Sequence, residues 1–158
     1  MTEPARKGRK PIWYIVGCIG LLAMPCIGTL AATVFRAFDE VTANLAAIKA
    51  GVERYCETEH SGRRGSLPRA AGPTLVAPGR DRQTPTLGPE WEDVSFHASG
   101  PSYYAYSIER PDAHTAIVVA ESDLDGDGAR SRYASTCTSD GTSQGCSCGQ
   151  LEIARERE

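Results

Sequence analysis

The feature that most constrains this chain is a long apolar and amphipathic stretch near its start, residues 12–55. Residues 12–35 carry no charge, and a helix of that length reaches roughly 36 Å, more than the ~30 Å of a hydrocarbon core. Neither glycine nor proline interrupts residues 29–50. We therefore expect one continuous helix, of which residues 12–35 form a transmembrane first half.

Beyond residue 35 the large apolar residues recur in steps of three and four, which places them along one side of a helix. The members of this apolar stripe are Phe38, Val41, Leu45, Ile48, Val52 and Tyr55. We expect residues 36–57 to cover a sheet with this stripe; a coiled-coil seam is the alternative. Pro25 is expected to kink the helix and to give it plasticity.

Charge is distributed unevenly about the apolar run. The 158 residues carry a formal net charge of −3. The tail, residues 1–11, holds four basic residues and one acidic residue, a balance of +3, so the remainder carries −6. A basic flank keeps its end of the chain in the cytoplasm, which places the part after the run outside. The scattered basic residues of that part argue against a nucleic-acid partner.

Four of the six cysteines lie beyond the apolar run, at Cys56, Cys137, Cys146 and Cys148. An even number in an exported domain predicts up to two disulfides, with three pairings open. A zinc site is the alternative, although the Cys-x-Cys spacing at the end is tighter than the usual knuckle. A lipoprotein that begins at Cys18 is a further alternative.

Composition divides the rest of the chain into three parts. Residues 58–90 are rich in glycine and proline and are expected to form a long connecting loop. Residues 91–137 are predicted to form an antiparallel sheet with short turns, and residues 138–158 a Cys-containing C-terminal segment. The expected strands lie near 91–97, 103–108, 115–120 and 132–136. A helix followed by strands predicts an α+β fold, with the long N-terminal helix packed on a small antiparallel sheet.

The strongest local motif is the acidic loop, residues 123–128. Asp123, Asp125 and Asp127 alternate with other residues there, as in the first half of a calcium loop. Ser131 is expected to supply a further oxygen. The glutamate that usually completes such a loop is absent, so an acidic turn between strands is the alternative to bound Ca²⁺.

In its overall organisation the chain resembles a type IV pilin or pseudopilin. The resemblance rests on Lys7-Gly8 ahead of the apolar run, the helix with Pro25 and its amphipathic continuation, the connecting loop, the sheet, and the Cys-containing end. It implies processing after Gly8 by a prepilin peptidase, so that the mature chain begins at Arg9. It also implies inner-membrane assembly machinery and other pilin-like subunits as partners. Where the family has a glutamate at the fifth mature position, this chain has Trp13.

The resemblance thus implies a structural, membrane-anchored, pilin-like subunit of a type IV pilus or type II secretion-like filament. Its expected location is the inner (cytoplasmic) membrane, single-pass, with the C-terminal domain in the periplasm or in an extracellular filament. An enzyme is not expected, because the sequence lacks a nucleophile motif and a glycine-rich phosphate loop. The alternative is a membrane-anchored extracytoplasmic binding or sensor domain that does not assemble.

Overall fold

The structure is a computed structural model that describes residues 13–58, 64–141 and 146–155, with side chains in 35–58, 64–141 and 146–153. The chain divides into two compact units, Met1–Ala37 and Phe38–Glu158. The helix α1, Trp13–Glu57, begins in the first unit and ends in the second. The second unit holds the remaining elements and is described below.

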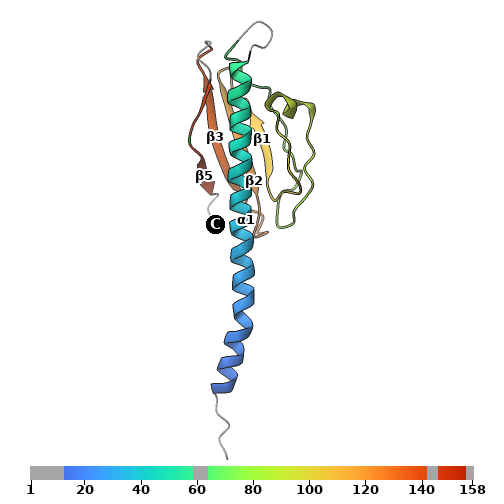
Figure 1. The fold of residues 1–158 in the computed structure, drawn as a ribbon, viewed down its shortest axis with the longest axis vertical. Coiled ribbons are helices and arrows are strands. Elements are labelled where there is room, and N and C mark those ends of the chain that lie inside the picture. Colours follow the sequence, from blue (N-terminus) through green and yellow to red (C-terminus); the bar gives the residue numbers. More distant parts are fainter. Residues whose placement is uncertain (1–12, 59–63, 142–145, 156–158) are drawn as a thin grey trace, which may run out of the picture. The chain divides into compact units, whose positions relative to one another are not determined.

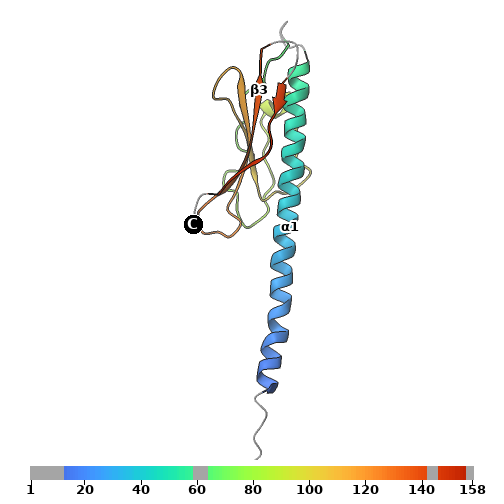
Figure 2. The same ribbon diagram turned by 90° about the vertical axis from the view of Figure 1, so that its left-hand side faces the viewer.

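An antiparallel sheet of five strands forms one layer of this unit (Figure 1). The strands are β1 (Ala105–Glu109), β2 (Thr115–Ser122), β3 (Ser131–Ser139), β4 (Cys146–Cys148) and β5 (Glu152–Arg155). The order is β1-β2-β3, and the far edge of β3 pairs with β4 at one end and with β5 at the other. The last turns of α1 form the second layer, which Figure 2 shows edge-on beside the sheet.

The core lies between these two layers. Along the part of α1 in the second unit, the fully buried side chains are those of Val41, Leu45, Ile48, Val52 and Cys56. The sheet faces them with large residues on β1 and mostly small ones on β2 and β3, namely Tyr106, Ile108, Ala116, Val118, Ala120, Ser135 and Cys137, all buried. Small side chains on the central strands let the helix lie close to the sheet. Each fully buried Val, Leu or Ile contributes roughly 1.5–3 kcal/mol.

The transmembrane part of the predicted fold is wrong. Among the residues that the structure describes, none of the helices combines the length and the apolar character that a membrane crossing requires. The part of α1 with described side chains, Phe35–Glu57, is apolar along one face and carries charged residues such as Arg36, Asp39 and Lys49 on the others. Its apolar face is used against the sheet, which explains why that part is amphipathic.

The strand expected at residues 91–97 is also wrong, because this segment begins with a 3₁₀-helix, η1 (Pro89–Val94). Trp91 and Val94 are three residues apart and both buried, which suits a helix with three residues per turn. Pro89 stands in the first turn, where its missing N–H costs nothing. The helix stops at Ser95, whose φ of 50° lies in the left-handed region.

The connecting segment between α1 and η1 is irregular in its described part, residues 64–88, yet it is attached to the sheet. Ala71 forms an antiparallel bridge with Ile108 on the outer edge of β1. The backbone N–H of Thr74 donates to the carbonyl of Tyr106 at 2.9 Å, and its hydroxyl accepts from the Tyr106 N–H at 3.0 Å. The segment thus covers an edge that would otherwise present unpaired backbone groups.

The end of the sequence contributes more structure than the sequence predicted. The expected sheet ended at residue 137, whereas β3 continues to Ser139 and two further strands follow it. Both strands pair with β3, β4 opposite Cys137–Ser139 and β5 opposite Ser131–Ala134. The C-terminal segment therefore completes the sheet.

Gly51 provides a test of how closely the helix approaches η1. A Cβ at this position would lie 2.2 Å from the carbonyl oxygen of Val94 and 2.9 Å from its Cβ. Gly51→Ala should therefore lower the free energy of unfolding by about 2 kcal/mol, despite the roughly 1 kcal/mol that alanine gains as a helix former. Urea denaturation measures the change.

Gly72→Ala is the matched control, because the nearest atom to a Cβ there is a Glu90 carboxylate oxygen at 3.9 Å. We expect its stability to stay within about 0.5 kcal/mol of the parent chain. A Gly51→Ala variant as stable as the Gly72→Ala variant would contradict the close approach.

Candidate functional site: a polar latch between helix and sheet

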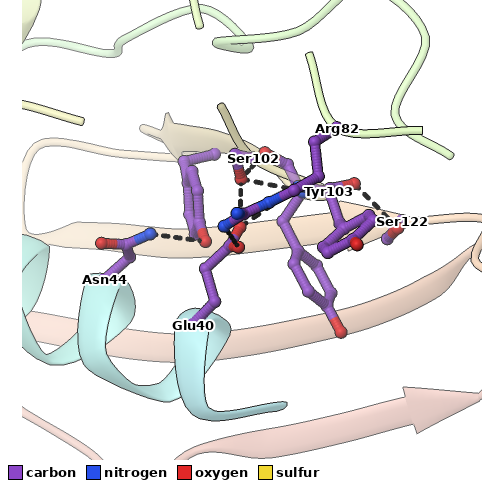
Figure 3. A network of polar contacts seen from close by, with 8 residues as sticks. Glu40, Asn44, Arg82, Ser102, Tyr103 and Ser122 are labelled. Carbon is purple, nitrogen blue, oxygen red and sulfur yellow. Dashed lines mark hydrogen bonds and ion pairs between the residues drawn. The ribbon is translucent and has the colours of Figure 1, made fainter. Parts of the chain in front are cut away.

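A carboxylate on α1 joins three separate segments of the second unit (Figure 3). Oε1 of Glu40 accepts a hydrogen bond from the Ser102 hydroxyl at 2.6 Å and one from the Tyr103 backbone N–H at 3.2 Å. Its Oε2 lies 2.6 Å from a guanidinium nitrogen of Arg82, which comes from the connecting segment. The Glu40 side chain is only 13% exposed, so these partners replace water around its charge.

One helical turn further on, Asn44 forms the second half of this contact. Its amide nitrogen donates to the hydroxyl of Tyr106 at 2.9 Å. Burial raises the pKa of Tyr106 to about 12, so the phenol stays protonated at neutral pH. Burial also raises the pKa of its neighbour Tyr104. We call Glu40, Asn44, Arg82, Ser102 and Tyr106 the polar latch.

The latch is shaped to position segments rather than to hold a large ligand. A hollow of about 160 Å³ lies beside Glu40, Asn44 and Arg82. The Arg82 guanidinium also lies 5.2 Å from the centre of the Tyr103 ring. Because the Arg82 side chain is half exposed, its ion pair alone contributes little stability. The hydrogen bonds to the turn before β1 are the stronger element.

At the other end of α1, two disulfides and two side chains hold the C-terminal segment. The disulfides join Cys56 to Cys146 and Cys137 to Cys148. Cys137 and Cys148 are opposite one another in the pairing of β3 with β4, so the sheet register selects this partner. The prediction of up to two disulfides is confirmed, and the competing zinc site loses its thiolate ligands.

Polar contacts reinforce that attachment. The Lys49 ammonium donates to the Gly149 carbonyl at 2.6 Å, and the Glu53 carboxylate accepts from the Cys148 backbone N–H at 3.1 Å. A buried serine, Ser135, also donates to the Gly149 carbonyl at 2.9 Å. The end of β4 and the following Gly149 are therefore fixed to the helix as well as to β3.

The acidic loop lies between β2 and β3 at the surface. Oxygens of Asp123, Asp125 and Asp127 all lie within 4.8 Å of one another. The Asp123 carboxylate accepts from the backbone N–H groups of Gly126 and Gly128, at 2.7 and 3.1 Å. This arrangement orders the turn without an ion, and Ca²⁺ at the three aspartates stays a prediction. Ser131 lies at the start of β3, opposite Ser122.

The other residues singled out in the sequence have different environments. Of the apolar stripe, four residues are buried in the core, as described above, whereas Phe38 is 45% exposed and Tyr55 is half-buried. Pro25 lies within α1, in the part without described side chains. The expected processing residues, Gly8 and Arg9, lie outside the described residues.

The sequence did not predict the polar latch, because its residues are far apart along the chain and follow no pattern. Glu40 and its partner Ser102 are 62 residues apart, and Arg82 stands in a segment without periodicity. The one usable signal is that a glutamate follows Asp39 next to an apolar stripe, where its side chain can reach the sheet. The chain matches no protein-family model, no curated protein and no solved structure.

Removing the latch carboxylate should destabilise the fold. In Glu40→Ala, the Tyr103 N–H loses its acceptor and the Ser102 hydroxyl keeps only the Tyr104 carbonyl in a largely buried place, which costs about 1–3 kcal/mol in the free energy of unfolding. Asp39→Ala is the control, since this neighbouring aspartate is exposed and should change stability by less than about 0.5 kcal/mol. Equal urea midpoints for the two variants would refute the latch.

The two disulfides should differ in their contribution to stability. They span 90 and 11 residues of sequence, so the chain-entropy model gives about 4.5 kcal/mol for the first and about 3 kcal/mol for the second. The double variant Cys56→Ala/Cys146→Ala should therefore unfold at a lower urea concentration than Cys137→Ala/Cys148→Ala. The opposite order would mean that strain or packing outweighs chain entropy.

The calcium prediction is tested by melting the chain with calcium and with a chelator. An ion that binds only the folded state stabilises it by an amount that grows with the logarithm of the ion concentration above its Kd, so the midpoint should rise in calcium. Asp127→Asn should remove that rise, because it takes one carboxylate from the cluster. Equal midpoints with calcium and with chelator would leave the loop as a turn stabilised by its own hydrogen bonds.

Proposed function

We propose that the chain is a structural subunit of a type IV pilus or type II secretion-like filament, and that it assembles with other pilin-like subunits through its N-terminal helix. One observation carries the proposal. Phe38, three residues before the buried Val41, is 45% exposed, and Phe35 is 71% exposed. A single exposed apolar residue is ordinary. Two phenylalanines at helical spacing, preceded by an uncharged run, favour burial against another molecule.

The remainder of the second unit suits a subunit that must keep its shape. The helix is attached to the sheet by the apolar stripe, by the polar latch and by the Cys56–Cys146 disulfide. Two disulfides also favour an oxidising compartment outside the cytoplasm, where a filament subunit is assembled. In this proposal the sheet forms the outward part of the subunit and performs no catalysis.

The family resemblance supplies the expected order of events. A prepilin peptidase would cut after Gly8, and inner-membrane assembly machinery would then add the subunit to the filament. Mass analysis of the N-terminus of native protein tests this step: a chain that begins at Arg9 supports processing. An intact Met1 together with no filament association would sink the assembly proposal.

The assembly surface is tested by replacing both exposed phenylalanines. Phe35→Ser/Phe38→Ser should abolish incorporation, measured by cross-linking and sedimentation of filaments sheared from cells, because two large apolar contacts are lost. The thermal midpoint of the purified variant should stay close to that of the parent, since neither side chain belongs to the buried core.

Val76→Ser is the matched control for this test. Val76 is 95% exposed on the connecting segment, so its replacement removes a comparable apolar surface elsewhere. Incorporation of this variant should equal that of the parent chain. A double phenylalanine variant that assembles as well as Val76→Ser would contradict the proposed surface.

A further inference from the structure

An open hollow of about 790 Å³ lies at the end of the sheet opposite to the polar latch. Its walls are the β1–β2 turn, the end of β3 and the segment that follows α1. The ionisable side chains that line it are Arg64, Arg110 and His114. All three are basic types, and none of the described residues that line the hollow is acidic.

Arg110 is fixed in the wall by neutral partners. Its guanidinium donates to the carbonyl oxygens of Leu67, Pro68, Asp112 and Ala113, at 2.9, 2.6, 3.2 and 3.0 Å. A guanidinium has five N–H donors, so one remains. Carbonyl dipoles satisfy hydrogen bonds but do not cancel a full charge, and Arg110 forms no ion pair within the described part of the chain.

The nearest carboxylate in the turn is engaged elsewhere. Asp112 accepts the backbone N–H of His114 at 2.7 Å. This hydrogen bond and one from Thr115 lower the pKa of Asp112, so its carboxylate stays ionised and is held against the backbone of the turn. Arg64 is exposed at the rim and makes no ion pair with the described residues, so its five donors can turn toward the hollow.

A buried serine holds the walls in place. The Ser139 backbone N–H donates to the His114 carbonyl at 2.9 Å, and its hydroxyl donates to the Gly65 carbonyl. The same hydroxyl accepts from the Gly141 N–H at 3.1 Å. One residue therefore links the turn, the end of β3 and the segment after α1. A hollow whose walls are fixed in this way requires little rearrangement to receive a ligand.

We propose that this hollow binds a small oxyanion, a phosphate or a carboxylate group, independently of filament assembly. Arg64 closes on the anion from the rim, the remaining Arg110 donor contacts it from the wall, and the His114 ring lies at its side. Guanidinium groups match the geometry of both anions. The positive charges of the two arginines provide the attraction.

The test uses the full chain, titrated with inorganic phosphate or with acetate against chloride at equal ionic strength. Calorimetry or the thermal midpoint should show saturable binding of an oxyanion and no effect of chloride. The arm that saturates at the lower concentration identifies the preferred anion. Absence of saturation in both arms overturns the proposal.

Arg64→Ala and His114→Asn are the informative variants, because Arg110→Ala would also remove four hydrogen bonds of the fold. Each should weaken binding about ten-fold, the loss expected for one charge-assisted contact. Arg36→Ala, which removes an exposed arginine on α1, is the charge-matched control and should bind as the parent does. If Arg64→Ala and Arg36→Ala bind equally well, the hollow is not the site.

Discussion

The burial of one face of α1 against the sheet is the interaction on which the rest of this unit depends. Val41, Leu45, Ile48 and Val52 are buried against β2 and β3, whose side chains on this face are mostly small, so that the helix backbone comes close. At this distance Glu40 reaches the turn before β1, and Cys56 reaches Cys146. The polar latch and the disulfide act at opposite ends of the same buried stripe, so each limits the rotation of the helix that the apolar contacts alone would permit.

The sequence predicted those parts of the fold that depend on local periodicity. Steps of three and four identified the buried residues of the helix, and alternation with short turns located β1, β2 and β3. The apolar stripe was misplaced at its ends. Phe38 is partly exposed. At the other end Cys56 rather than Tyr55 is fully buried, because its disulfide to Cys146 of β4 holds it against the sheet.

The remaining features depend on contacts between distant residues. The segment before β1 alternates like a strand, yet it forms the 3₁₀-helix η1. Pro89 stands in its first turn, and Trp91 and Val94 are buried one turn apart. Val94 of η1 packs against Gly51 of α1. β5 is four residues long and too short for alternation to reveal. The polar latch combines residues from three segments, and so does the hollow lined by Arg64, Arg110 and His114. Charge patterns along one segment do not show such combinations. The transmembrane assignment failed for a different reason: it rested on the length of the uncharged run and on its basic flank, and none of the described helices has the apolar character that a crossing requires.

The covered edge of β1 has a consequence for how copies of this chain can meet. Ala71 and Thr74 occupy the backbone groups of Ile108 and Tyr106 that a strand from another molecule would need. Extension of the sheet by a foreign strand is therefore blocked on this side, both in productive contacts and in misfolded aggregates. Recognition along this border must come from the exposed side chains of the connecting segment, such as Val76, because Thr74 and Arg82 are committed to contacts within the unit.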